Sequence, residues 1–333
     1  MIGQRFGDTN TGRKRRRNED SFVCEPPLFA VADGMGGAQA GEIASALVAA
    51  AVSGALKEGD NVTGPAALLL VVQLIHEANR RVHDRATHDS AASGMGTTMT
   101  VALVDSEGGV AIGHVGDSRA YRLRAGELVQ LTDDHSLVAE LVRRGELTAA
   151  EAEIHPQRSV ITRALGTDPD VDVDAFAADA APGDIFLLCS DGLSTMVDAD
   201  TIGVLVERNR SDLRDAARAL IDAANDSGGE DNITAVLFEI VPDDPTRENV
   251  LAETASHPDE EDTLHPEDGV RLPPELLGPE SDTLVVSAAD WQQQALALEP
   301  EPPLPLARLF ASTALIVFLI AAIVALSFWG LTR

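Results

Sequence analysis

The stretch LFAVADGMGG at positions 28–37 joins an apolar run directly to an Asp-Gly step. DIFLLCSDGL at 184–193 has the same arrangement, and in GGEDNITAVLF at 228–238 an Asp after a glycine turn precedes the apolar run. Short apolar runs bounded by Gly and Asp are typical of buried strands. Asp33, Asp191 and Asp231 each lie where such a strand meets a turn, so their side chains are predicted to converge at one end of a sheet.

Carboxylates gathered in this way repel one another unless a cation neutralises them. Their hard oxygen atoms suit Mg²⁺ or Mn²⁺, and glycines beside them allow the backbone to approach a ligand closely. Zinc is disfavoured because the eight histidines are scattered and there are only two cysteines. One Asp-Gly step alone is an ordinary turn, whereas three attached to strands favour a divalent-cation site.

A basic run, RKRRR at 13–17, precedes the acidic pair Glu19-Asp20. Such a run alone could indicate nucleic-acid binding. The adjacent acids and the net charge of −29 argue against nucleic acid as a partner. Guanidinium groups bind phosphate through paired N–H donors, so an arginine beside a cation site indicates phosphoryl chemistry.

Residues 1–241 are predicted to form one mixed α/β-type domain. Strands are expected at 28–32, 97–104, 110–114 (in tandem with the second, over about 110–123), 185–189 and 233–240, and helices at 40–56, 65–85, 136–144 and 211–224. A turn containing Gly108-Gly109 joins the second and third of these strands. This short connection favours antiparallel pairing over a Rossmann-like βαβ series.

The segment 242–307 differs in composition from the domain. It holds 11 of the 17 prolines and 16 acidic residues against two arginines, a net charge of −14. Such a composition cannot bury enough apolar surface to fold, so a disordered tether is predicted. Within it, DEEDTL (259–264) and PESDTL (279–284) resemble each other. The similarity is either chance or a pair of docking or phospho-acceptor motifs at Thr263 and Thr283.

Residues 308–333 contain 23 consecutive uncharged positions, 309–331. A helix of that length spans roughly 34 Å, enough for a hydrocarbon core of about 30 Å. A single transmembrane helix is therefore predicted. No apolar signal segment occurs at the N-terminus, MIGQRFGDTN, so the domain is expected on the cytoplasmic side of the cell membrane. Cys24 and Cys189 are expected to be reduced thiols.

Eight motifs resemble the protein phosphatase 2C family, the metal-dependent Ser/Thr phosphatases, and in particular its bacterial membrane-tethered branch. They occur in family order over about residues 1–240: GRKRRRNEDSF (12–22), VADGMGG (31–37), GMGTTMT (94–100), GHVGDSRAYRL (113–123), LTDDHS (131–136), HPQRSVITRALG (155–166), LLCSDGL (187–193) and EDNIT (230–234).

The resemblance implies an α+β fold, in which two packed antiparallel sheets have helices on both outer faces (an α-β-β-α sandwich). It implies hydrolysis of phosphoserine and phosphothreonine by a metal-activated hydroxide, without a covalent intermediate. Two Mn²⁺ or Mg²⁺ ions and a weaker third are expected as cofactors. Phosphorylated proteins are the expected partners, among them a membrane Ser/Thr kinase that the enzyme opposes.

The resemblance also assigns residue roles. Asp33 would bridge two metals, with Asp191 and Asp231 completing the first site. The Gly34 carbonyl would serve the second, with Glu19 acting through water. Asp117 would join Asp191 at the third metal site, and Arg15 would bind the phosphate. Asp20 and Asn232 would hydrogen-bond to the metal ligands without binding the metals themselves. The segment 136–166 would be a mobile flap over the site.

Three positions depart from the family pattern. Met35 replaces the histidine that animal members carry as a proposed general acid, so the leaving-group acid is unassigned. Ala38 and Asn10 replace a His and an Asp common in relatives, and a modest effect on substrate handling is expected. The alternatives are a non-catalytic, membrane-tethered scaffold that binds phosphoproteins and a phosphatase for a dedicated partner-switching regulator. The intact acidic residues argue against the scaffold, and the undiverged motifs argue against the regulator phosphatase.

Overall fold

The computed structural model describes residues 1–36, 40–56, 60, 62–242 and 284–285. Two antiparallel sheets are packed face to face, as predicted. The first sheet has the order β1 (Ile2–Asn10), β12 (Ile233–Ile240), β11 (Ile185–Cys189), β7 (Arg119–Arg124), β8 (Glu127–Gln130). The second has the order β10 (Asp174–Ala178), β6 (Val110–Val115), β5 (Met99–Val104), β3 (Leu28–Met35), β2 (Asp20–Glu25), and β4 (Gly96–Thr97) pairs with the end of β3.

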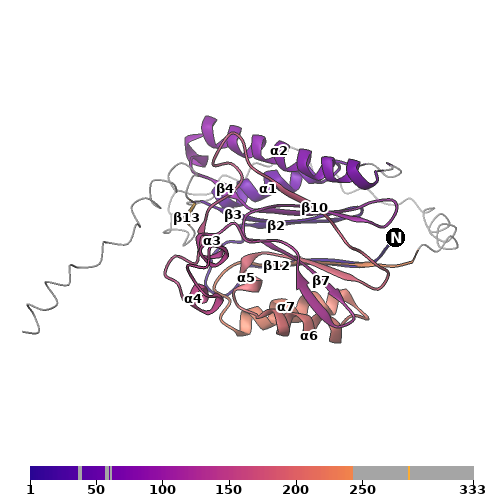
Figure 1. Cartoon of the computed structure of the whole chain (residues 1–333). Coiled ribbons are helices and arrows are strands. Elements are labelled where there is room, and N and C mark those ends of the chain that lie inside the picture. Colours follow the sequence, from indigo (N-terminus) through magenta and orange to yellow (C-terminus); the bar gives the residue numbers. More distant parts are fainter. Residues whose placement is uncertain (37–39, 57–59, 61, 243–283, 286–333) are drawn as a thin grey trace, which may run out of the picture. The chain divides into compact units, whose positions relative to one another are not determined.

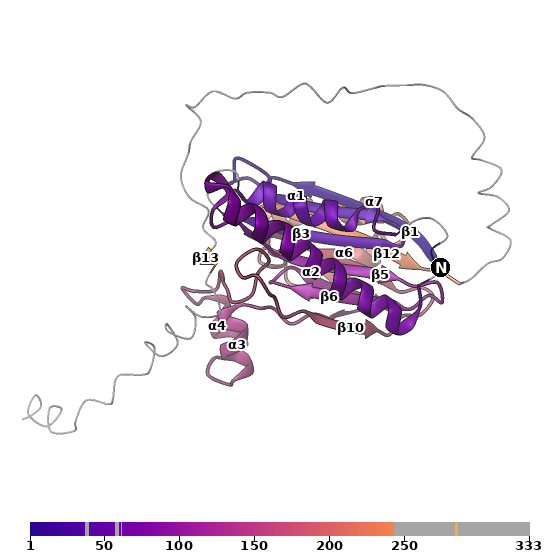
Figure 2. The ribbon, with the colours of Figure 1, turned by 90° about the horizontal axis from the view of Figure 1, so that it is seen from above.

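Helices cover the outer face of each sheet (Figures 1 and 2). The second sheet carries α1 (Ala40–Val52) and α2 (Gly64–His88), and the first carries α6 (Ala199–Arg208) and α7 (Leu213–Asp226). Strands between two apolar layers are buried on both faces, which explains their nearly continuous apolar sequences. The helices predicted at 40–56, 65–85 and 211–224 are confirmed with ends shifted by a few residues, while α6 was not predicted.

The space between the sheets is filled by aromatic and branched side chains. Phe29 stacks on Phe238 with ring centroids 4.1 Å apart, and Phe186 stacks on Phe238 at 5.2 Å. Alternate residues of β3 point the other way, so Ala30 and Ala32 pack in the cluster beneath α1 and α2. This two-residue alternation lets one strand contribute to two cores.

The strand predicted at 110–114 is confirmed as β6. The longer tandem run to about 123 is divided, because β6 ends at Val115 and β7 begins at Arg119, in the other sheet. Gly116 makes the change of direction possible, because it has φ +113° and a Cβ there would lie 2.5 Å from Thr98 Cγ2. The predicted antiparallel pairing across Gly108-Gly109 is confirmed between β5 and β6.

The segment 136–166, called the flap below, contains α3 (Leu137–Arg143), α4 (Ala149–Glu153) and β9 (Val160–Ile161). The helix predicted at 136–144 is α3. Two short helices lie elsewhere, η1 (Ser90–Ala92) and α5 (Asp191–Ser194). A two-residue strand, β13 (Leu284–Val285), pairs in parallel with β9.

Met1 is joined to Val241, the residue directly after β12. Met1 N donates to the Val241 carbonyl over 2.9 Å, and Val241 N donates back over 2.8 Å. Within the described ranges, no helix is long and apolar enough to span a membrane. The transmembrane helix predicted at 309–331 lies outside those ranges. The tether predicted at 242–307 also lies outside them, except for residues 242, 284 and 285.

Candidate active site

Three strand ends place the predicted acidic residues at one edge of the sandwich. Asp33 lies near the end of β3, Asp191 begins α5 directly after β11, and Asp231 lies two residues before β12. The pKa of Asp33 is held well above its usual value by burial first, and then by the charges of Asp20, Asp191 and Asp231. The sheets therefore bring together the carboxylates that the sequence placed at separate turns.

The carboxylates of this cluster disfavour one another's ionised forms. The pKa of Asp191 is raised to about 6 by burial and by the charge of Asp231, partly offset by a hydrogen bond from Asp33. Burial and the charge of Asp191 likewise raise the pKa of Asp117 well above its usual value. Such a cluster takes up protons or a cation to relieve the repulsion.

Arg15, in the basic run, forms an ion pair with the cluster. Its Nη2 donates to Asp231 Oδ2 over 2.8 Å, and its side chain is 20% exposed. Arg13, by contrast, pairs with Asp226 on the surface, where its side chain is 59% exposed. Of these two, only Arg15 faces the carboxylates.

Glu19 and Gly34 meet through their backbones. Gly34 N donates to the Glu19 carbonyl over 3.1 Å, and Glu19 N donates to Asn232 Oδ1 over 2.7 Å. A Cβ on Gly34 would lie 2.1 Å from the Gly41 carbonyl oxygen, so only glycine fits. Burial raises the pKa of Glu19, while Arg15 acts to lower it.

Asp20 and Asn232 support the ligands from behind. Asn232 Nδ2 donates to the carbonyls of Thr11 and Arg17, each over 2.9 Å. Asp20 Oδ2 accepts from Ser190 Oγ over 2.8 Å and from Thr234 Oγ1. Burial raises the pKa of Asp20 to about 7. Ser190 and Thr234 were not predicted, although both lie in the motifs LLCSDGL and EDNIT.

The chemistry of these donors fits a hard divalent cation. Every donor in the cluster is oxygen, and the buried atoms Asp20 Oδ1 and Asp191 Oδ1 have no hydrogen-bond partner in the structure. Among the described side chains, no group of three or more His, Cys, Asp or Glu residues is already drawn together around a cation-sized site. The residues that would hold a bound ion are Glu19, Asp33, Gly34, Asp117, Asp191 and Asp231.

A cleft of about 890 Å³ opens beside this cluster. Its walls include Arg15, Asp117 and Asp191 from the site, and Arg158 and Ser159 from the flap. Met35 is 2% exposed and packs with Ile161 and Ala164 of the flap. The position at which animal relatives carry a histidine is therefore an apolar contact under the flap. Ala38 lies outside the described residues, and Asn10 accepts from Gly12 N in an exposed turn.

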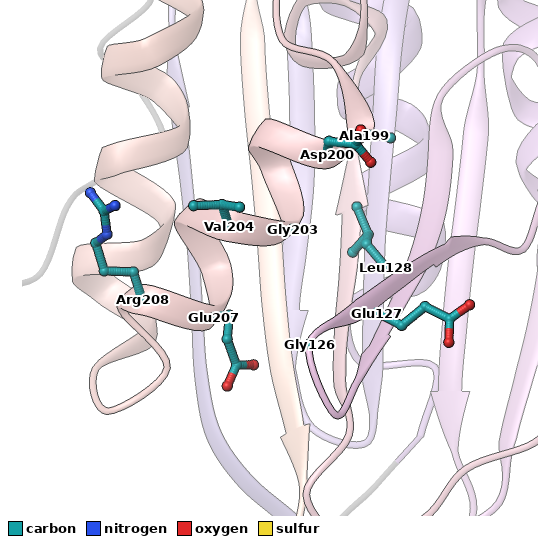
Figure 3. A pocket seen from close by; sticks show the side chains of 9 residues that line it. All are labelled: Gly126, Glu127, Leu128, Ala199, Asp200, Gly203, Val204, Glu207 and Arg208. Carbon is teal, nitrogen blue, oxygen red and sulfur yellow. The ribbon is translucent and has the colours of Figure 1, made fainter.

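Another groove, of about 810 Å³, lies between the β7–β8 hairpin and α6 (Figure 3). Its lining includes Glu127, Leu128, Val204 and Glu207 but none of the clustered carboxylates. The carboxylate cluster therefore opens to the first cleft, which Asp117, Asp191 and Asp231 line, and not to this groove.

Comparison with known proteins agrees with the family resemblance of the motifs. The sequence profile described as protein phosphatase 2C matches residues 13–237. A serine/threonine phosphatase stp from Listeria welshimeri is 40% identical over 243 residues, which cover 69% of this chain and 93% of the relative. The chain belongs to the protein phosphatase 2C family.

Solved structures give the same result. The Mycobacterium tuberculosis serine/threonine phosphatase PstP/Ppp superposes with a TM-score of 0.68 at 37% identity, covering 73% of this chain and all of that one. The catalytic domain of a PstP solved with two manganese ions superposes with a TM-score of 0.64 at 35% identity, covering 72% of this chain and 99% of that one. Manganese or magnesium dependence fits this family.

Proposed function

We propose that the chain is a protein serine/threonine phosphatase that hydrolyses phosphoserine and phosphothreonine monoesters. The observation that carries the proposal is the half-buried cluster of Asp33, Asp191 and Asp231, of which Asp191 and Asp231 line an open cleft together with Arg15. The carboxylate oxygens can bind hard cations, and such cations together with the adjacent guanidinium complement the negative charge of a phosphoryl group.

Each group in the site has a role that follows from its position. A divalent cation, when bound, supplies Lewis-acid polarisation of the phosphate and of water. Arg15, oriented by Asp231, binds the phosphoryl oxygens and offsets charge that develops on them. Asp20 and Asn232 hold the ligand-bearing loops in place. Cys189 is buried in β11 and its thiol has a pKa raised to about 12 by burial, so it is unsuited to act as a nucleophile.

The test is hydrolysis of matched phosphothreonine, phosphoserine and phosphotyrosine peptides with Mn²⁺ and with a chelator. Metal-dependent release of phosphate from the first two peptides supports the proposal. Binding of the peptides without turnover would instead favour the scaffold alternative. A broad panel of phosphoproteins distinguishes a general phosphatase from one dedicated to a single regulator.

We also propose three regions for the whole protein: a catalytic domain at 1–241, an acidic linker at 242–307 and a transmembrane helix at 308–333. Composition supports this division, because the uncharged run 309–331 follows a segment of net charge −14. The domain would then act at the cytoplasmic face on phosphoproteins that include a membrane kinase. Carbonate extraction and protease protection of full-length protein test this, with a chain ending at residue 308 as the control. Release of the full-length protein by carbonate would contradict the anchor.

A further inference from the structure

The histidine of the LTDDHS motif joins the flap to the loop that carries Asp117. We infer that His135 is a positioning residue: it holds this loop and the base of the flap in one arrangement, so that cation binding at Asp117 and the order of the flap depend on it. The inference rests on the proposed function. All the contacts that support it are between residues that the structure describes.

On the loop side, one residue satisfies both backbone polar groups of Gly116. His135 N donates to the Gly116 carbonyl over 2.7 Å, and Gly116 N donates to His135 Nδ1 over 3.0 Å. Asp117 follows Gly116 directly; the residue is 8% exposed and lines the cleft. The imidazole therefore sets the peptide that aims Asp117.

On the flap side, the same residue contacts the segment after β9. Thr162 N donates to the His135 carbonyl over 2.8 Å. His135 Nε2 lies 3.1 Å from Asp174 Oδ2, and Arg163 Nη1 donates to Asp174 Oδ1 over 2.7 Å. Arg163 belongs to the flap and Asp174 to β10, so the carboxylate of Asp174 binds the histidine and the flap arginine together.

The two sides together define the tautomer of the ring. Because Nδ1 accepts from Gly116 N, the proton of neutral His135 is on Nε2, where it donates to Asp174. Arg163 Nη1 also lies 3.0 Å from Nε2, but a protonated Nε2 cannot accept, so Arg163 acts on Asp174. His135 is 3% exposed, and its ring therefore connects two elements with no solvent between them.

This connection has a consequence for catalysis. Asp117 and the flap residues Arg158 and Ser159 line the same cleft. Loss of the imidazole should loosen the two cleft walls formed by the Asp117 loop and the flap. Asp33, Asp191 and Asp231 lie on other strand ends and should keep their positions. Residues that orient a metal ligand typically contribute about 10- to 100-fold to metal affinity.

Three variants separate the two sides. His135→Ala removes both side-chain contacts. His135→Asn keeps an acceptor near the position of Nδ1 but cannot reach Asp174. Asp174→Ala removes only the flap side and alters a half-exposed surface residue, so it tests the inference even if the His135 variants fold poorly. His88→Ala, at the exposed end of α2, is the matched control.

The measurements on the full-length protein are Mn²⁺ calorimetry, hydrogen exchange over 136–166, and separate kcat and KM values for a phosphopeptide and a small phosphate ester. For His135→Ala we expect the weakest Mn²⁺ site to lose about 10-fold or more in affinity. Flap exchange should be faster and KM for the phosphopeptide higher, with kcat for the small ester nearly unchanged at saturating Mn²⁺. For His135→Asn and Asp174→Ala we expect faster flap exchange with Mn²⁺ affinity largely kept.

Unchanged Mn²⁺ affinity and unchanged flap exchange in folded His135→Ala would overturn the inference, as would unchanged flap exchange in Asp174→Ala. A wild-type protein without phosphatase activity would contradict the proposed function instead. Calorimetry and hydrogen exchange would still decide the role of His135 in that case.

Discussion

At the scale of single residues, the site is a place where stability and function oppose each other. Asp20, Asp33, Asp117 and Asp191 all have raised pKa values because burial disfavours their ionised forms and their charges repel. A sequence selected for stability alone would not keep four such carboxyls together. Their presence is explained by a ligand whose positive charge reverses the repulsion.

The first prediction concerns Asp33→Asn. The substitution removes one charge from the crowded cluster, so the metal-free variant should melt no lower than the metal-free wild type. Activity should fall by a factor on the order of 10³ or more, because a central ligand is lost. Thermal melts with EDTA and with Mn²⁺, together with ester hydrolysis, check both expectations. Wild-type turnover of Asp33→Asn in Mn²⁺ would disprove the assignment of Asp33. Asp117→Ala should lose less activity than Asp33→Asn.

The second prediction concerns phosphate binding. Arg15→Ala should lower kcat/KM by roughly 10- to 100-fold, the range for losing a hydrogen bond between charged groups, with much of the loss in KM. Arg16→Ala, an exposed neighbour in the same run, is the control and should have a smaller, salt-dependent effect. Steady-state kinetics on a small ester measure both. Equal losses in the two variants would show that Arg15 has been misassigned.

At the scale of elements, the turn between β6 and β7 links fold to site. It moves the chain from one sheet to the other, and its residues bind the ends of neighbouring strands: Ser118 Oγ is 2.7 Å from Thr98 Oγ1, and Thr98 N donates to the Asp33 carbonyl over 2.9 Å. Two buried histidines, His114 and His135, pack beside this turn with ring centroids 4.7 Å apart.

The third prediction follows from His114. Its pKa is lowered to about 4, by burial first and then by His135, so the unfolded chain binds this proton more tightly than the folded one. The stabilising effect of a neutral His114 is therefore present above the unfolded pKa of about 6.5 and is lost as the pH falls towards 4. Relative to His114→Gln, the wild type should lose on the order of 2 kcal/mol over this window.

Urea unfolding with EDTA at several pH values measures this difference. The comparison with His114→Gln is needed because Asp20 and Asp191 have raised pKa values and act in the opposite direction: their contribution to stability is lost as the pH rises. A difference between the two proteins that is independent of pH would contradict the assignment of His114 as buried and neutral.

At the scale of the whole molecule, the catalytic unit is closed by its own ends. The hydrogen bonds between Met1 and Val241 complete the pairing of β1 with β12. All the residues placed in the site lie within this closed unit. The proposed linker, 66 residues from 242 to 307, would as a flexible coil span about 45 Å.

The fourth prediction is that a chain ending after Val241 keeps its turnover of a small phosphate ester, because every site residue is retained. Its rate on a phosphoprotein held in a liposome should fall, since the tether no longer supplies effective concentration. Both rates are compared for the truncated and full-length proteins in the same liposomes. Loss of ester hydrolysis would place part of the catalytic unit beyond residue 241.

Sequence alone determined which residues are special. The apolar runs that end near Asp33 and Asp191 or follow Asp231 predicted strands with an acidic residue at one end, because burial and strand geometry leave a local pattern. The same local reasoning extended the strand at 110–114 towards 123, although the chain changes sheet at Gly116. It also missed the edge strands β1, β2, β8 and β10, whose mixed polarity lacks a continuous apolar run.

Tertiary structure decided which of these residues meet. Glu19 N reaches Asn232, and Arg15 reaches Asp231, across more than 200 positions of sequence. The raised pKa values of the carboxyls and the contacts of His135 also arise only when separate strands are packed. A residue's identity is a property of the chain, but its electrostatic environment is the sum over neighbours in space, and those neighbours are set by the pairing and packing of the two sheets.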